Sequence, residues 1–313
     1  MSLTASGSIE RRAAVRPKPE RREHIPLGIF YMISATAVFA ASSAISKLLV
    51  VTYPVGEVLF ARNIVGIVLV GAFILPRFGL MVFETRKLSS HAVRSVSQCC
   101  SQTFILLAFS MMPLAGAVAI NFSAPLFATL VAAVLFKEYV GPARWLALLV
   151  GFLGVLMVTH PGAGTFQLGS LFALGNAILY GSVTVGVRRM TATESTETLT
   201  MYQLVFLTCF FALSLPFACV MPSWSDAGMM FINGVANALG QYWWTRSLHL
   251  APTSAVVPFN YFSLVWAMIL GLLIWGDVPT LPLLAGSAIV VGSGLFLLWS
   301  ETTGRRRRVA NRK

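Results

Sequence analysis

Long apolar runs separated by short polar or Pro- and Gly-containing breaks make up most of the chain. A helix needs about 20 largely apolar residues to cross the hydrocarbon core of a bilayer, and the breaks leave segments of about that length. Ten such segments are predicted, at residues 27–51, 55–75, 92–111, 114–136, 143–159, 168–187, 199–220, 227–245, 253–275 and 281–299. The pattern therefore predicts an all-α, polytopic membrane protein with ten transmembrane helices.

The connections between these segments alternate in charge. Every second connection contains Lys or Arg, and the five intervening connections contain neither. The cationic connections hold Arg77, Arg86, Lys87, Lys137, Arg144, Arg188, Arg189 and Arg246. Because cationic loops are retained on the cytoplasmic side, both termini are predicted to be cytoplasmic, in a bacterial inner (plasma) membrane. Termini on one side require an even number of spans, which ten satisfies.

Composition excludes a water-soluble domain. Of the 313 residues, 57% are hydrophobic and 11% are charged, whereas soluble domains contain roughly 25% charged residues. The net charge of +12 does not indicate a nucleic-acid partner, because 12 of the 23 Lys and Arg residues lie in two tails, residues 1–26 and 300–313. Such tails are typical of cytoplasmic flanks and can contact anionic lipid. Segment 27–51 is too long for the apolar core of a signal peptide and is interpreted as a retained anchor.

The sequence contains no motif for catalysis or cofactor binding. The four cysteines lie inside apolar runs without CxxC spacing, and the four histidines are scattered over tail and helix-end positions. HExxH, P-loop and GxSxG motifs are absent from the sequence, and these are the patterns that would indicate metal, nucleotide or nucleophilic chemistry. We therefore predict neither an enzyme nor a resident metal or cofactor.

An internal repeat is visible at an offset of 139 residues. Its anchors are the pairs Pro113 and Pro252, Asn121 and Asn260, and Glu138 and Asp277. The unit is five helices long and is predicted at residues 27–160 and 161–299. Because an odd number of spans reverses the orientation of the second copy, the halves are predicted to be inverted repeats, as in many secondary transporters.

Both copies resemble a known family. The first reads PLAGAVAINFSAPLFATLVAAVLFKEYVGPARWLALLVGFLGVLMV, and the second reads APTSAVVPFNYFSLVWAMILGLLIWGDVPTLPLLAGSAIVVGSGLFLL. A proline in mid-helix, an acidic residue after the helix and a Gly-rich following span resemble the EamA-type branch of the drug/metabolite transporter superfamily. Arg62 in EVLFARN matches the family's usual arginine, whereas Asp277 stands where Glu is commoner. The resemblance implies a transporter whose fourth and ninth helices line a central cavity, and APTSAVVPFNYFSLVWA is similar to members that move riboflavin or S-adenosylmethionine.

Three charged residues are candidates for an outer vestibule. Lys47 and Arg62 are cations inside predicted spans, within about two helical turns of the outer face, and Glu57 lies at the mouth of the second span. One interpretation is that Lys47 pairs with Glu57 while Arg62 binds helix-end carbonyls. The other is a vestibule charge that meets an anionic group of a solute. No carboxylate lies in mid-span, which favours facilitated diffusion, exchange or coupling through another group over a carboxylate relay.

Uncharged polar residues recur at helical spacing inside several predicted spans. Amides exposed to lipid cost several kcal/mol each, so these positions are expected to face protein or a cavity. Together with nearby aromatic residues they give a predicted substrate site of Gln98, Gln102, Asn121, Tyr180, Asn237, Gln241, Asn260, Tyr261 and Trp266. The alternative is hydrogen bonding between helices. Pro125 and Pro258 fall inside the fourth and ninth spans and are predicted to kink or hinge them.

The function predicted from these features is alternating-access transport of a small organic metabolite or drug, such as an amino acid, a nucleoside-like or a flavin-like solute. The alternatives are a flippase for a lipid-linked solute and a non-transporting membrane partner subunit. The expected partners are the solute and the lipid bilayer, with no nucleic acid. The direction of transport, any coupling ion and the oligomeric state, including a homodimer, stay open from the sequence.

Overall fold

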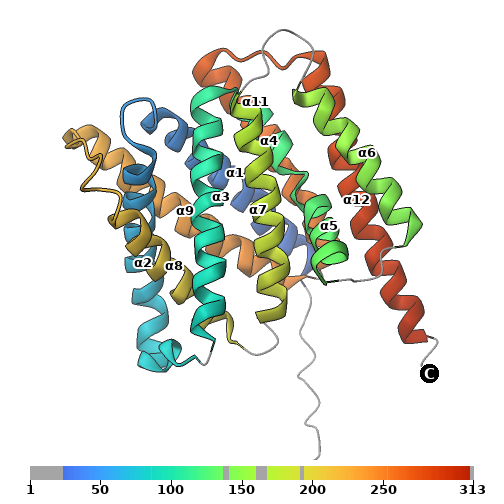
Figure 1. Ribbon diagram of the computed structural model, residues 1–313, viewed down its shortest axis with the longest axis horizontal. Helices are drawn as coiled ribbons and strands as arrows, with labels where there is room; N and C mark the ends of the chain where they lie inside the picture. The colour runs from blue at the N-terminus through green and yellow to red at the C-terminus, as the bar shows by residue number, and fades with distance from the viewer. Residues whose placement is uncertain are drawn as a thin grey trace, which may run out of the picture.

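The computed structural model describes residues 24–85, 87–136, 141–159, 168–190, 194–251 and 253–310, and all regular structure in these ranges is helical. The helices form a single bundle (Figure 1). Their bounds are α1 Ile25–Leu49, α2 Val55–Phe78, η1 Gly79–Phe83, α3 Leu88–Met111, α4 Leu114–Asn121, α5 Ala124–Phe136, α6 Pro142–Thr159, α7 Leu168–Met190, α8 Thr196–Ala212, α9 Trp224–Leu250, α10 Thr253–Val256, η2 Val257–Tyr261, α11 Phe262–Trp275 and α12 Leu281–Ala310.

Each predicted segment coincides with helical structure, but two segments are not continuous. The fourth is divided between α4 and α5, and the ninth among α10, η2 and α11. Pro125 is the second residue of α5 and Pro258 the second residue of η2. A proline is tolerated there because the first turn of a helix leaves its N–H groups unpaired. In both segments the helix is interrupted and restarts at the proline, and a hinge at Pro125 and Pro258 stays a prediction.

Two ends also differ from the predicted bounds. The seventh segment was expected to reach residue 220, but α8 ends at Ala212. Pro216 follows shortly, and proline restricts the residue before it and lacks the N–H that a continuing helix needs. At the other end of the chain, α12 continues to Ala310 and includes most of the predicted tail of residues 300–313.

Five stretches in the described residues are long and apolar enough to cross a membrane. They are Ile25–Leu49, Val55–Phe83, Leu114–Val134, Leu168–Val187 and Pro258–Trp275, and shorter apolar helices cover Trp145–Val158, Glu197–Ala212 and Leu281–Phe296. The helices α3 and α9 have the length but not the hydropathy. Both contain the polar residues singled out above, so they depend on protein partners for those groups.

The bundle is held by long helix pairs that join residues far apart in the chain. The helix α1 packs on α9, α3 on α7, and α6 on α12. One apolar core runs through both halves and includes the fully buried Leu59, Leu106, Leu114, Leu207 and Ala267. In the α6–α12 pair the backbones approach so closely that a Cβ on Gly154 would lie 2.9 Å from the Gly286 carbonyl oxygen. Small residues permit this close packing. In a membrane such packing drives helices to associate, because lipid provides no hydrophobic driving force between them.

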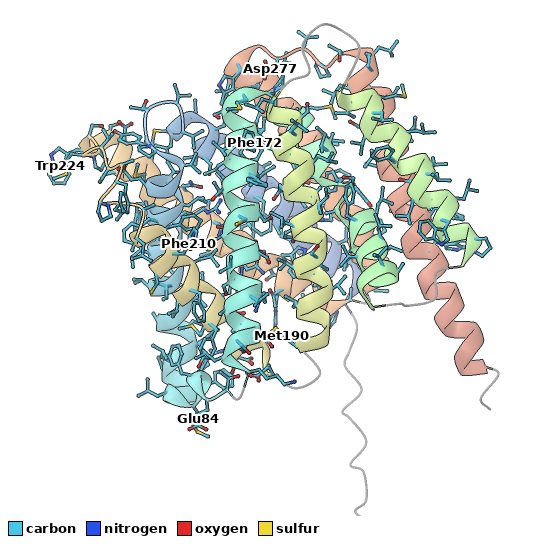
Figure 2. The ribbon with its side chains drawn as sticks, viewed as in Figure 1. Glu84, Phe172, Met190, Phe210, Trp224 and Asp277 are labelled. Carbon is cyan, nitrogen blue, oxygen red and sulfur yellow. The ribbon has the colours of Figure 1, made fainter. Side chains whose placement is uncertain are left out.

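The two ends of the bundle can be distinguished. Glu84 and Met190 lie at the lower end, and Trp224 and Asp277 at the upper end (Figure 2). The backbone N–H of His24 donates to the Leu250 carbonyl at 3.0 Å, so α1 begins where α9 ends. The predicted N-terminal tail up to residue 23, together with Arg86, Lys137, Glu138 and Pro252, lies outside the described residues.

Candidate functional site

A polar cluster connects α2 and α3 inside the bundle. The Nη2 of Arg62 donates to the Oε1 of Gln102 at 2.9 Å, and the Nδ2 of Asn63 lies 3.5 Å from the same oxygen. The Nε of Arg62 is buried and has no hydrogen-bond partner among the described residues. Gln98, one turn before Gln102, is 7% exposed. Arg62 thus binds a side-chain amide, where helix-end carbonyls were expected.

A second polar chain starts from the neighbouring residue on α3. The Oγ of Ser101 donates to the Oδ1 of Asn176 at 2.7 Å, and the Nδ2 of Asn176 donates to the Oδ1 of Asn121, also at 2.7 Å. These bonds connect α3 to α7 and α7 to α4. Asn121 is the last residue of α4, where the fourth segment breaks. The interruption of the backbone is therefore accompanied by a pair of amides, of which that of Asn176 is buried.

The two broken segments meet at their breaks. The ring of Phe122, which follows α4, and the ring of Tyr261, the last residue of η2, have centroids 4.8 Å apart. Tyr261 also packs against α12, because a Cβ on Gly294 would lie 2.2 Å from the Tyr261 hydroxyl oxygen. On α11, the buried indole Nε1 of Trp266 has no hydrogen-bond partner among the described residues. A ring pair thus joins the fourth and ninth segments, and an indole donor without a described partner lies further along the ninth.

The amides of α9 have different roles from one another. Asn233 is fully buried, accepts a hydrogen bond from the Oγ of Ser42 at 2.6 Å and donates to the Oγ of Ser46 at 2.9 Å. Asn237 and Gln241, one and two turns further on, make no side-chain hydrogen bond to another described residue. Asn233 therefore joins α9 to α1, whereas Asn237 and Gln241 keep their hydrogen-bonding capacity.

The outer charges do not pair as one interpretation expected. The Nζ of Lys47 donates to the Met112 carbonyl at 2.7 Å and lies 4.8 Å from the centroid of the Trp275 ring. The carboxylate of Glu57 is 5% exposed and accepts from the backbone N–H of Val220 at 2.9 Å. Among the described residues no ion pair joins Lys47 to Glu57. Lys47 is stabilised by a carbonyl and an aromatic face, and Glu57 by a backbone donor.

The predicted site residues fall into two groups. In the first group, Asn121 and Asn260 directly precede Phe122 and Tyr261 in the sequence. The contact between the Phe122 and Tyr261 rings therefore brings the breaks that contain these amides together. No hydrogen bond or ring contact in the described part of the chain joins Tyr180, Asn237 or Gln241 to these residues, and Tyr180 exposes 46% of its surface. Three bonded residues, Ser101, Asn63 and Asn176, were not among the predicted site residues. Asn176 was detectable from its spacing with Tyr180 and Thr184 on one helix face.

The described residues of the site do not form a cluster of metal ligands. Within the described ranges, no three His, Cys, Asp or Glu side chains come together as metal ligands would. The polar groups that do converge are amides, hydroxyls and a guanidinium, accompanied by aromatic rings. Such groups recognise an organic solute by hydrogen bonding and stacking.

Comparisons with known proteins agree on one class. The sequence model of the EamA-like transporter family matches residues 26–160 and again residues 167–299. A riboflavin transporter of Vibrio cholerae is 29% identical over 91% of this chain and 97% of its own. An S-adenosylmethionine uptake transporter of Rickettsia conorii is 23% identical over 90% and 95%, and a pseudopaline exporter of Pseudomonas aeruginosa is 25% identical over 84% and 93%.

A solved structure, described as "Crystal structure of protein", has the same fold. It superposes with a TM-score of 0.60 at 19% identity, and the match covers 90% of this chain and 97% of that one.

Proposed function

Since this chain belongs to the EamA-like transporter family, a family of small-molecule transporters rather than enzymes, we propose that it moves a small organic metabolite across the inner membrane by alternating access of two inverted halves. The family sets the class of activity. The inverted repeat, the ten transmembrane spans and the location of the solute site are proposed here in addition to that class.

One observation carries the proposal of inverted halves. Phe122 and Tyr261 are 139 residues apart, the offset of the internal repeat, so they occupy equivalent positions, and their rings touch. A residue that contacts its own equivalent lies close to the pseudo-two-fold axis that relates two repeats. Both residues sit where their segment breaks, and secondary transporters place substrate at interrupted helices between their repeats. The two matches of one family model support the same division.

The arrangement of the ends supports a ten-span topology. The helix α1 begins beside the end of α9, at the end of the bundle opposite Trp224. Glu84 and Met190, which border two of the cationic connections in the chain, also lie at that end. The positive-inside rule then makes this end cytoplasmic. Two helices too polar to be counted as spans by hydropathy, α3 and α9, each bond an amide to another helix, Gln102 to Arg62 on α2 and Asn233 to Ser46 on α1.

The solute site is proposed near mid-membrane, around the two breaks. Rings of Phe122, Tyr261 and Trp266 offer stacking faces, and Asn237, Gln241 and Asn260 offer amides without partners among the described residues. A flat heterocycle with polar edges uses both kinds of group. Relatives named riboflavin transporter and S-adenosylmethionine uptake transporter support a flavin-like or nucleoside-like solute as the first class to test.

The test is a solute panel followed by counterflow. Thermal-shift screening of the purified protein should identify a heterocyclic solute that raises its midpoint. Proteoliposomes preloaded with that solute should then accumulate its labelled form, and the accumulation should persist when the pH gradient is collapsed, because no carboxylate lies in mid-span. Counterflow reports transport whichever direction operates in the cell. Absence of counterflow for every solute that binds would refute transport, and strict dependence on the gradient would refute uncoupled exchange.

A further inference from the structure

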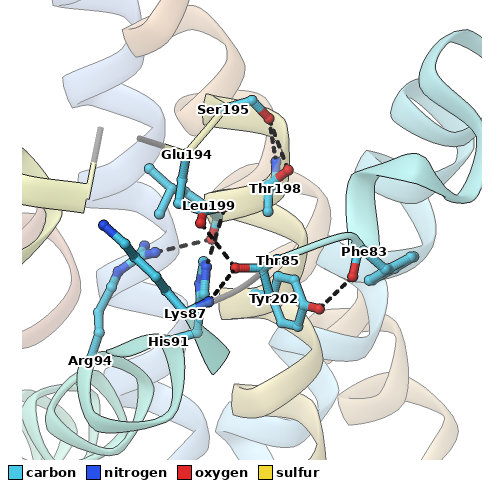
Figure 3. Close-up of polar contacts among 10 residues, drawn as sticks. All are labelled: Phe83, Thr85, Lys87, His91, Arg94, Glu194, Ser195, Thr198, Leu199 and Tyr202. Carbon is cyan, nitrogen blue, oxygen red and sulfur yellow. Dashed lines mark hydrogen bonds and ion pairs between the residues drawn. The ribbon is translucent and has the colours of Figure 1, made fainter. Parts of the chain in front are cut away.

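Several contacts tie the two halves together at the lower end of the bundle (Figure 3). His91, in the first turn of α3, is fully buried, with its Nε2 3.8 Å from the Oε2 of Glu194. The other oxygen of Glu194 accepts from the Oγ1 of Thr85 at 3.0 Å. The Nη1 of Arg94 donates to the Leu199 carbonyl at 3.1 Å. The first half thus holds the start of α8 and the connection just before it.

Tyr202 completes this contact set. Its hydroxyl donates to the Phe83 carbonyl at 2.6 Å, and its ring lies 4.5 Å from the His91 ring. The Nη2 of Arg94 donates to the Oε1 of Gln203 on the same helix. We call these contacts the α3–α8 latch. They use groups from three elements of the first half, a backbone carbonyl of η1 and side chains of the following connection and α3, against one helix start of the second half.

The upper end has a corresponding set, the α2–α9 latch. The hydroxyl of Tyr53 donates to the Oδ2 of Asp226 at 2.7 Å, and the backbone N–H of Ser223 donates to the Tyr53 oxygen at 3.3 Å. Beside it, Glu57 accepts from the N–H of Val220 at 2.9 Å. The hydrogen bond to Asp226 raises the pKa of Tyr53 above its ordinary value. Again the first half holds a helix start of the second half.

The two latches are built from corresponding elements. Tyr53 lies two residues before the first residue of α2, and Glu194 lies two residues before the first residue of α8. Tyr53 meets Asp226 in the first turn of α9, and Glu194 meets His91 in the first turn of α3. In a five-helix repeat, α2 corresponds to α8 and α3 to α9. The same junction therefore occurs twice, once at each end.

We propose that the α3–α8 and α2–α9 latches are the two gates of the transporter, and that each access state breaks one latch while the other stays closed. The proposal rests on the proposed function, since gates matter only if the halves move. With both latches formed, the structure corresponds to the state closed at both ends. Each latch consists of a few hydrogen bonds at helix starts, joined in the α3–α8 latch by the His91–Glu194 and His91–Tyr202 contacts, while the long pairs α1–α9, α3–α7 and α6–α12 run between the latches. Such small contact sets can be exchanged without repacking the core.

The experiment removes one hydroxyl from each latch. Tyr202→Phe deletes the bond to Phe83, and Tyr53→Phe deletes the bond to Asp226, with both rings retained. Tyr242→Phe is the matched control, because its hydroxyl makes no hydrogen bond to a described residue and its ring pairs with that of Phe73, outside both latches. A reporter cysteine replaces Asn237, in a background where Cys99, Cys100, Cys209 and Cys219 are serine.

The readout is the rate at which an impermeant maleimide labels the reporter in vesicles of defined orientation. Tyr202→Phe should raise labelling from the face of the α3–α8 latch by about threefold to tenfold, the change in opening equilibrium expected for one hydrogen bond. Tyr53→Phe should do the same from the opposite face only. Tyr242→Phe should change neither rate. Equal effects on both faces, or none, would overturn the proposal, because a merely structural bond has no reason to act on one side.

A second measurement does not depend on weakened variants. A bismaleimide spanning Tyr53→Cys and Asp226→Cys should abolish labelling from the α2–α9 face and preserve it from the other face. Loss of labelling from both faces would overturn the gate assignment. Labelling needs no solute, so its outcome is independent of counterflow. A protein that labels asymmetrically but moves no solute would refute the proposed function alone, and one that exchanges solute but labels symmetrically would refute the gates alone.

Discussion

The helices α3 and α9 are the third helices of their halves, and each contains amides at helical spacing, yet the amides serve different ends. On α3, Gln102 accepts a hydrogen bond from Arg62, and its neighbour Ser101 donates one to Asn176. On α9, Asn233 is hydrogen-bonded to Ser42 and Ser46. Asn237 and Gln241 make no side-chain hydrogen bond to described residues. Among the described residues, Gln102 and Ser101 of α3 are therefore bonded to other helices, whereas the amides of α9 change from bonded at Asn233 to unbonded at Asn237 and Gln241.

This difference shows why a polar stripe cannot be assigned one role. Hydrogen bonds between helices and contacts to a solute require the same residue types at the same spacing. What separates them is whether a partner stands opposite each amide. The comparison predicts that substitutions on the bonded positions reduce stability, whereas those on the unbonded positions reduce solute affinity.

The largest loss of stability is expected for Asn233→Leu. This change leaves the buried hydroxyls of Ser42 and Ser46 without their shared partner, which should lower the free energy of unfolding by about 1 to 3 kcal/mol. Equilibrium unfolding in mixed micelles measures the loss. Asn237→Leu, one turn away, is the control and should change stability by no more than about 0.5 kcal/mol. Equal losses at the two positions would remove the distinction drawn along α9.

A smaller loss is expected for Gln102→Leu on α3. Arg62 then loses its side-chain acceptor while its Nε is already unpaired among the described residues, and the expected cost is about 1 to 2 kcal/mol in the same unfolding assay. Gln102→Glu keeps an acceptor and adds a charge opposite to that of Arg62, so it should restore stability. If Gln102→Glu were as unstable as Gln102→Leu, the acceptor role of Gln102 would be wrong.

The smallest change in stability, but a clear change in binding, is expected for Gln241→Ala and Asn260→Ala. Neither side chain is bonded to described protein groups, so the free energy of unfolding should change by no more than about 0.5 kcal/mol. Affinity for the solute found in the thermal-shift screen should fall by about 1 to 3 kcal/mol, because each amide loses a direct hydrogen bond to it. Calorimetric titration measures this, with Thr245→Val on the same helix as control. Unchanged affinity in both variants would assign these amides to packing.

Particular residues show where sequence reasoning worked. The apolar lengths located the helices of all ten segments, and the Gly-rich span of the first copy contains Gly154, which packs closely against Gly286. The motifs identified the family, which the match over both halves confirms. These features are local, since segment length, small residues and motif spacing can be read from neighbouring positions alone.

Other features were not local. Lys47 and Glu57 have opposite charge and similar depth, so a sequence favours pairing them, but Met112 and Trp275 provide the contacts of Lys47 in space. His91 and Arg94 lie near the start of α3 and Glu194 lies in the connection before α8, and only the packing of α3 on α8 brings them together. Contacts between residues about 100 positions apart leave no periodic signal in either segment.

From the amino-acid sequence alone it follows that the chain is helical, that it belongs in a membrane and which class of transporter it is, because burial in lipid constrains every span to be apolar and internally hydrogen-bonded. Packing in three dimensions sets which polar side chains are bonded to protein, where the broken helices meet and which residues link the two halves at each end. Those outcomes depend on which side chain stands opposite which, and helix packing fixes that between segments far apart in the chain.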